Sequence, residues 1–454
     1  MAKLSVIAPA GASVLQPILN TQRATSMAAQ SPSTRANNSL NDIARNSLQG
    51  KVGQTHYVVR LPILDPMSNV FAYELLFWGG QELTTAWNNE VATHAVFSNA
   101  MVFGIEELAS GRPAFIQCTA VSLTEEWVWN LPPSLTIVEL HEDSNPSPAQ
   151  LDACNRLKSL GFKIALGNFT GKPGARALLE LANYVLVNIA ILSANDRRLL
   201  RAFLCDVPAC PIATNVESQE EYRAAWGAGF KLFQGQYFCR PEPVRDHQIP
   251  ANRMLHIQIL EAIQNDPIDL NQLSSLIMRD ASLTYTLLRL ANSPLFAIRQ
   301  EITSIHSALV LLGEERSRRI AMLAIATDFD TGQPPELLRM AFERARFGEL
   351  SAELLSLSPS EQYLIGMASM FPAMLRMKVE NLVPLLPFRE QARAALLGRQ
   401  CREGVFLDLM VCQDRVDWTS YDALVKANGL RLDQLMWRYA EAQDWANATI
   451  QTMQ

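Results

Sequence analysis

The sequence lacks the features that mark several large classes of protein. Its seven cysteines contain no Cys-x-x-Cys pair, and its six histidines are not spaced with cysteines as zinc ligands are, which argues against a zinc site. No apolar run approaches about 18 residues, so no transmembrane helix is expected. Basic residues number 39 against 45 acidic ones, a formal charge of −6, which leaves no broad surface for nucleic acid. The odd cysteine count and the weak N-terminal apolar stretch predict a cytoplasmic protein with reduced thiols.

What is present indicates two folded domains behind a polar segment. Residues 1–52 are rich in Ser, Asn, Ala and Gln and are predicted to form a disordered tail. In residues 53–248, short apolar runs such as AFIQCTA and SLTIVELHE alternate with helical stretches. This alternation favours parallel strands with helical crossovers and a closed (β/α) barrel. Residues 249–454 follow the proline-rich stretch CRPEPVRDHQIP and have a helical pattern to the end. The predicted fold class is therefore α/β plus all-α.

Single residues predict two helix boundaries in the second half. In SIHSALVLLGEERSRR, Ser304 suits an N-cap, the apolar residues of 305–312 share one face, and Gly313 supplies a stop. The helix before it should end at Asn292-Ser293-Pro294, because proline disfavours helical backbone in the residue that precedes it.

Several blocks of the first half resemble the EAL family of cyclic di-GMP phosphodiesterases. In chain order these are RLPILDPMSNVFAYELLFW, FIQCTA, IVELHED, IALGNFTG, YVLVNI, IATNVESQEEY and FQGQYFCRP. The second half resembles the HDOD family of helical signalling domains through LIMRDASLTYTLLRLANSPLF and EITSIHSALVLLGEERSRRIAML. Everything but the tail therefore resembles EAL–HDOD proteins of the YuxH group. The resemblance implies a modified (β/α)8 EAL barrel followed by an all-helical HDOD domain.

The resemblance also implies where a metal site would lie. Members of the family cleave a phosphodiester with one or two Mg²⁺ or Mn²⁺ ions, held by carboxylates and an amide. The corresponding residues in this sequence are Glu74, Gln117, Glu139, Gly167, Asn168, Leu186, Asn188, Thr214, Glu217 and Gln234. Glu74 and Glu139 are still able to ligate a cation. Gly167 and Asn168 stand at a pair of aspartates, and Leu186 stands at a lysine.

This loss of charge predicts a degenerate barrel that no longer catalyses. The leading hypothesis is a non-catalytic bacterial signalling adaptor without metal or cofactor. It would act through protein partners in a cyclic di-GMP-related or surface-behaviour pathway. Two alternatives stay open: a cyclic di-GMP receptor that binds without hydrolysis, and a divergent metal-dependent phosphodiesterase. Leu61 and Phe77 replace a glutamine and a phosphate-binding arginine of the family, which argues against tight nucleotide binding. A homodimer is also left open.

The helical half has candidate sites of its own. The family it resembles is related to metal-dependent phosphohydrolases with a His-Asp pair, and the position of that pair falls at Ser369 and Met370. No metal is expected there. Arg316, Arg318 and Arg319 form a small basic cluster, which would either bind the acidic face of a partner or form the solvated end of a helix.

Overall fold

The computed structural model describes most of the chain beyond the predicted tail. The described residues are 57–78, 104–119, 122–124, 126–141, 146–170, 176–192, 208–240, 251–265, 267–293, 302–328, 334–386 and 388–453. By its internal contacts the chain divides into Met1–Gly53 and Gln54–Gln454, and the description below concerns the second unit. The predicted tail (1–52) and the predicted domain boundary at 248–249 lie outside the described residues. Within these ranges, no helix has the length and apolar character needed to span a membrane.

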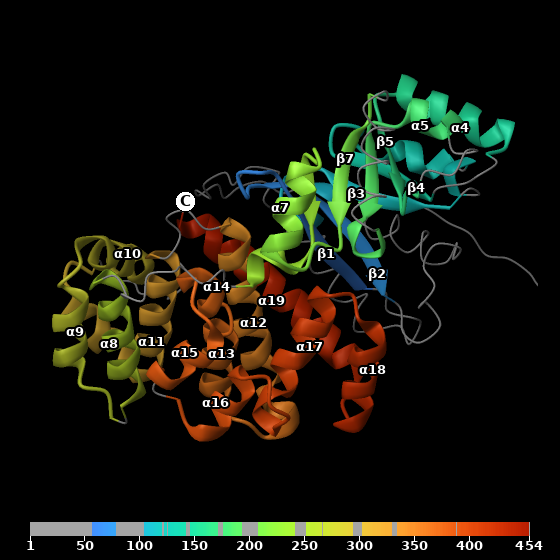
Figure 1. Ribbon diagram of the computed structural model, residues 1–454. Helices are drawn as coiled ribbons and strands as arrows, with labels where there is room; N and C mark the ends of the chain where they lie inside the picture. Colours follow the sequence, from blue (N-terminus) through green and yellow to red (C-terminus); the bar gives the residue numbers. More distant parts are fainter. Residues whose placement is uncertain are drawn as a thin grey trace, which may run out of the picture. The chain divides into compact units, whose positions relative to one another are not determined.

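The first half is a closed barrel of eight strands in the order β1 to β8 (Figure 1). The strands are β1 (Tyr57–Leu64), β2 (Val70–Trp78), β3 (Ala114–Cys118), β4 (Thr136–His141), β5 (Lys163–Gly167), β6 (Tyr184–Asn188), β7 (Cys210–Thr214) and β8 (Leu232–Gln234). The helices between them are α3 (Ile105–Leu108), α4 (Pro148–Ser159), α5 (Arg176–Leu181) and α7 (Gln219–Gly227). The predicted barrel of strands and crossover helices is confirmed.

Strand β1 makes this barrel a modified one. It pairs antiparallel with both β2 and β8, whereas β2 to β8 run parallel to one another. Leu61 lies directly opposite Glu74 in the β1–β2 pair. Because successive side chains of a strand point to opposite faces, this register sends both of these residues to the same face. The carboxyl ends of β2 to β8 meet at one rim, which is where parallel barrels carry their sites.

The second half is helical throughout its described residues, as predicted. Its helices are α8 (Ala251–Gln264), α9 (Leu270–Ile277), α10 (Ala281–Ala291), α11 (Ile305–Asp328), α12 (Pro335–Ser351), α13 (Pro359–Ala368), α14 (Phe371–Leu375), α15 (Val379–Leu382), α16 (Glu390–Leu396), α17 (Val405–Asp414), α18 (Trp418–Ala427) and α19 (Leu432–Met453). Helix α12 is buried over most of its length and packs against α13 and α19.

The predicted helix boundaries are borne out, with one difference. The hydroxyl of Ser304 accepts from the Ser307 amide at 3.2 Å, and Asn292 caps the C-terminus of α10. Gly313 leaves helical geometry with φ 73° and ψ 173°. The helix that begins at Ile305 therefore stops at Gly313 as predicted, but a second helix follows at once, so that α11 consists of two helices that meet in a kink.

Helix α13 contacts α12 through a glycine. A Cβ added at Gly366 would lie 2.4 Å from the backbone oxygen of Arg344 on α12. Such a separation is too short for any side chain, so the two helix backbones meet closely only because residue 366 is glycine.

We therefore expect Gly366→Ala to lower the free energy of unfolding by about 1–3 kcal/mol, because the added methyl group forces the two helices apart. Gly227→Ala is the matched control, since Gly227 also lies in a helix but has no atom within 4 Å of an added Cβ. That control should be neutral or stabilising by up to about 1 kcal/mol. Urea unfolding followed by circular dichroism measures both variants, and equal midpoints would contradict the packing described.

Candidate carboxylate site in the barrel

The barrel interior consists of an apolar layer with a more polar layer above it. The apolar layer is one cluster of buried residues that includes Ala72, Phe115, Ile137, Ala165, Leu186, Ile212 and Leu232. Two residues further along each strand, and so on the same face, stand Glu74, Gln117, Glu139, Gly167, Asn188, Thr214 and Gln234. Seven of the ten predicted positions therefore share one layer at the carboxyl ends of β2 to β8. Leu186 belongs to the apolar layer beneath it, so this position offers the site no cation.

Glu74 is held by two side-chain hydrogen bonds within this layer. Its carboxylate accepts from Gln117 Nε2 at 2.8 Å on one oxygen and from Gln234 Nε2 at 2.6 Å on the other. The side chain is only 6% exposed. Burial raises the pKa of Glu74 above its ordinary value, and the two amide donors oppose that rise. Gln117 and Gln234 thus hold the carboxylate from both sides.

Glu139 is buried without such support. It lies opposite Gln117 in the β3–β4 register and is 1% exposed. Its Oε2 atom has no hydrogen-bond partner among the described residues. Burial raises the pKa of Glu139 well above its ordinary value, and the nearby charge of Glu74 raises it further. Two carboxyl groups thus lie in one buried layer, where burial and, for Glu139, the charge of Glu74 disfavour ionisation.

The GN pair at the end of β5 has a conformational role. Gly167 is buried opposite His141 of β4, while Asn168 is exposed and has φ 49°. Asparagine tolerates this left-handed conformation better than most residues, so it lets the chain turn sharply out of the strand. The structure places the amide of Asn168 outside the buried layer.

Three further predicted residues, Asn188, Thr214 and Glu217, do not add a charge to the buried layer. Asn188 Oδ1 accepts from the Ala190 amide at 3.0 Å and caps the short 3₁₀ helix Ile189–Ile191. Thr214 is buried opposite Asn188 in the β6–β7 register. Glu217 lies beyond β7 and pairs with Arg240 at 2.9 Å, with both side chains partly exposed. These residues frame the site without adding a buried charge to it.

The predicted His-Asp position of the helical half borders a cavity of about 210 Å³. Arg344, Ser369 and Asp408 are among the residues that line it. Arg344 Nη1 donates to Ser369 Oγ at 3.1 Å, while Met370 is buried. Burial raises the pKa of Asp408. An arginine thus stands beside Ser369, at the position predicted to correspond to the His-Asp pair.

The three arginines of the predicted basic cluster have different surroundings in the structure. Arg318 donates to the backbone oxygens of Ile263 and Asn265, at the C-terminal end of α8. Arg319 pairs with Glu315 and Glu349 and lies over the Tyr363 ring. Both side chains therefore tie α11 to its neighbours. Arg316 is exposed, and a role for it in binding a partner stays a prediction.

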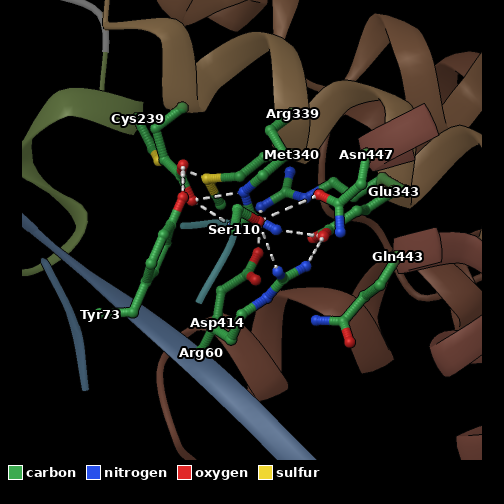
Figure 2. A network of polar contacts seen from close by, with 12 residues as sticks. Arg60, Tyr73, Ser110, Cys239, Arg339, Met340, Glu343, Asp414, Gln443 and Asn447 are labelled. Atoms are coloured by element: carbon green, nitrogen blue, oxygen red, sulfur yellow. Dashed lines mark hydrogen bonds and ion pairs between the residues drawn. The ribbon is translucent and has the colours of Figure 1, made fainter. Parts of the chain in front are cut away.

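The sequence did not reveal a second polar group on the outer face of the β1–β2 pair. Arg60 and Tyr73 point away from the barrel interior and contact α12 (Figure 2). The sequence does contain one indication of this group, which is Arg60 within the otherwise apolar strand YVVRLPIL. An arginine in such a strand indicates a buried partner, but the sequence does not show where in the chain that partner lies.

The retained residues fit a divalent cation only in part. Among the described residues no group of three or more His, Cys, Asp or Glu is placed to hold a metal. Glu74 and Glu139 nevertheless supply two carboxylates, flanked by the amides of Gln117 and Gln234. Mg²⁺ is commonly bound by one or two carboxylates together with substrate phosphates and water. The unpartnered Glu139 oxygen and the unneutralised pair therefore fit one cation completed by a phosphate ligand.

Comparisons with known proteins agree with this two-part architecture. Residues 249–367 match the family model of the HDOD domain. The chain is 28% identical over 399 residues to cyclic di-GMP phosphodiesterase CdgJ of Vibrio cholerae, covering 86% of this chain and 92% of that protein. It is also 28% identical over 404 residues to the uncharacterized protein YuxH of Bacillus subtilis, covering 86% and 98%. The chain has the EAL–HDOD architecture.

A solved structure of the barrel half is similar at lower identity. The FimX EAL domain of Pseudomonas aeruginosa, bound to c-di-GMP, is 18% identical with a TM-score of 0.34, covering 44% of this chain and 94% of that one. The match to the Vibrio cholerae protein over most of both chains, together with the HDOD match, supports a role in signalling.

The prediction that the chain is not an enzyme is wrong. A relative that aligns over 92% of its own length is named a cyclic di-GMP phosphodiesterase. The prediction gave most weight to the charges lost at Gly167, Asn168, Leu186 and Asn188. The structure shows that Glu74 and Glu139 lie in one buried layer, so the lost charges do not by themselves remove the site.

The two buried glutamates predict a stability that falls as the pH rises. The folded protein holds their protons to a higher pH than the unfolded chain, in which they titrate near 4.5, so unfolding is favoured as they ionise. The free energy of unfolding should fall from about pH 4.5 upward by at most about 1.4 kcal/mol per pH unit for each group. Glu139→Gln should flatten this fall, whereas Glu107→Gln, at an exposed residue of α3, should not. Urea titrations between pH 4 and 9 test this, and parallel curves for parent and Glu139→Gln would contradict it.

Proposed function

We propose that this EAL–HDOD chain is a divergent cyclic di-GMP phosphodiesterase whose barrel binds a single divalent cation with Glu74 and Glu139. The observation that carries the proposal is the buried carboxylate pair, in which Glu139 Oε2 has no partner among the described residues. The relationship to a protein named as a cyclic di-GMP phosphodiesterase supports the choice of substrate.

The residues of the site have separable roles in this proposal. Gln117 and Gln234 orient Glu74 by donating to its two carboxylate oxygens. Glu139 offers its unpartnered oxygen to the cation. The apolar layer beneath, which includes Phe115 and Leu186, closes the barrel floor and excludes water from below. When bound, the cation would activate water and stabilise charge on the phosphoryl oxygens.

The reduced set of ligands favours one cation and a slow reaction. Two-metal sites clamp both the attacking and the leaving oxygen, and they need more anionic ligands than two glutamates provide. Leu186 leaves the site without a lysine to meet the phosphate. We therefore expect turnover to be low and to depend on the concentration of added cation.

The helical half is proposed to carry the protein-binding part of the signalling role. Arg316 is exposed on α11, whereas Arg318 and Arg319 bind neighbouring helices, so Arg316 is the candidate for an acidic protein partner. Sedimentation of the purified chain at several concentrations tests whether two copies associate.

The test of the proposed function is cleavage of cyclic di-GMP by the full chain with Mn²⁺ or Mg²⁺, followed by chromatography of the nucleotide. We expect metal-dependent formation of the linear dinucleotide. Glu74→Gln and Glu139→Gln should each lower the rate about 100-fold or more, because each replaces a carboxylate ligand by a neutral amide of the same shape. Glu107→Gln makes the same change at an exposed residue of the barrel half and should leave the rate unchanged.

Two results would contradict the proposal. Recovery of intact cyclic di-GMP from a protein that binds it would make the chain a receptor. Cleavage that survives both Glu74→Gln and Glu139→Gln would place the chemistry elsewhere in the chain.

A further inference from the structure

A buried ionic cluster joins the β1–β2 pair to α12. Arg60 Nη2 lies 3.1 Å from Glu343 Oε1, and Tyr73 Oη donates to Glu336 Oε2 at 2.9 Å. Arg339 pairs with both Glu336 and Glu343. Figure 2 shows Arg60 and Arg339 converging on Glu343, with Tyr73 extending toward the same group from the strand. All five residues are more than nine-tenths buried.

The cluster is closely matched in charge and geometry. Two arginines face two glutamates, and the guanidinium groups of Arg60 and Arg339 lie 5.7 Å and 5.6 Å from the centroid of the Tyr73 ring. Arg60 Nη1 also donates to the Leu108 oxygen and to the Ser110 hydroxyl. A buried charge that loses its partner is strongly unfavourable, so the cluster holds its members in one arrangement.

Strand alternation connects this cluster to the barrel site. Tyr73 and Glu74 are consecutive in β2, so their side chains lie on opposite faces of the same strand. Tyr73 reaches Glu336 on the outside, while Glu74 meets Gln117 and Gln234 on the inside. A displacement of this strand by the cluster would therefore displace the Glu74 carboxylate as well.

A second contact anchors the segment of Gln234, which is the other hydrogen-bond partner of Glu74. Gln236, two residues beyond Gln234, donates through Nε2 to the backbone oxygen of Asp414 on α17 at 2.8 Å. Asp414 is itself fixed by Arg344 of α12 at 2.7 Å. Both the strand that carries Glu74 and the segment that carries its partner Gln234 are thus anchored on the helical half.

We propose that α12 and α17 of the helical half position the Glu74 carboxylate, and that Tyr73 is the positioning residue that transmits the contact. This inference rests on the proposed function and adds to it a control of the barrel site by the helical half. Anything that loosens the contact of α12 with β2 weakens the cation site, and cation binding in turn strengthens that contact.

The test is the Mn²⁺ dependence of cleavage by the full chain carrying Tyr73→Phe, which deletes only the hydroxyl that bonds Glu336. We expect the Mn²⁺ concentration for half-maximal activity to rise about fivefold or more, with the maximal rate regained at saturating Mn²⁺. A general folding defect would instead lower the rate at every Mn²⁺ concentration.

Tyr363→Phe is the matched control. Tyr363 is 1% exposed and lies beneath Arg319, as Tyr73 lies beside two arginines, but its hydroxyl has no hydrogen-bond partner among the described residues. This variant should keep the parental Mn²⁺ dependence. An unchanged Mn²⁺ dependence in Tyr73→Phe as well would overturn the inference.

Failure of the proposed function is distinguishable from failure of this inference. If the parental chain does not cleave cyclic di-GMP, the proposed function fails, and hydrogen exchange then decides the inference. The amides of residues 70–78 should exchange faster in Tyr73→Phe than in Tyr363→Phe, while those of β5 should exchange alike. Equal exchange of residues 70–78 in the two variants would overturn the inference.

Discussion

Strand β2 places consecutive side chains in two different buried polar environments, and both the site and the contact between the two halves depend on its register. Tyr73 faces the arginine–glutamate cluster on α12, and Glu74 faces the barrel interior. A shift of one residue against β1 would bring Tyr73 into the barrel and turn the carboxylate outward. Polar partners on both faces therefore fix the strand more firmly than apolar packing alone would.

The two polar environments differ in how fully their charges are balanced. On the outer face, two arginines and two glutamates neutralise one another. Inside the barrel, Glu74 has two amide donors, but Glu139 keeps an oxygen without a partner in the described chain. A buried carboxylate that nothing neutralises costs stability, and such a cost is usually retained where a ligand relieves it. The balanced group suits a structural role, and the unbalanced one suits a binding site.

Local patterns predicted much of this arrangement. The alternation of apolar runs and helical stretches predicted the barrel, and Ser304, Gly313 and Asn292 marked real helix ends or kinks. The resemblance placed Glu74, Gln117, Glu139 and Gln234 at the positions that the structure brings into one layer. The outer cluster was beyond sequence reasoning because Arg60 and Glu343 are 283 residues apart. The capping role of Asn188 was missed because an amide suits a metal ligand and a cap equally well.

Glu74 and Glu139 are proposed to bind one divalent cation together, beside a phosphate of cyclic di-GMP. The most direct measurement is anomalous diffraction at the manganese edge from crystals of the full chain grown with Mn²⁺ and a non-hydrolysable cyclic di-GMP analogue. An anomalous peak is expected within ligand distance of one oxygen from each glutamate and of a phosphoryl oxygen. Clear density for the analogue in the barrel with no anomalous peak at these glutamates would contradict it.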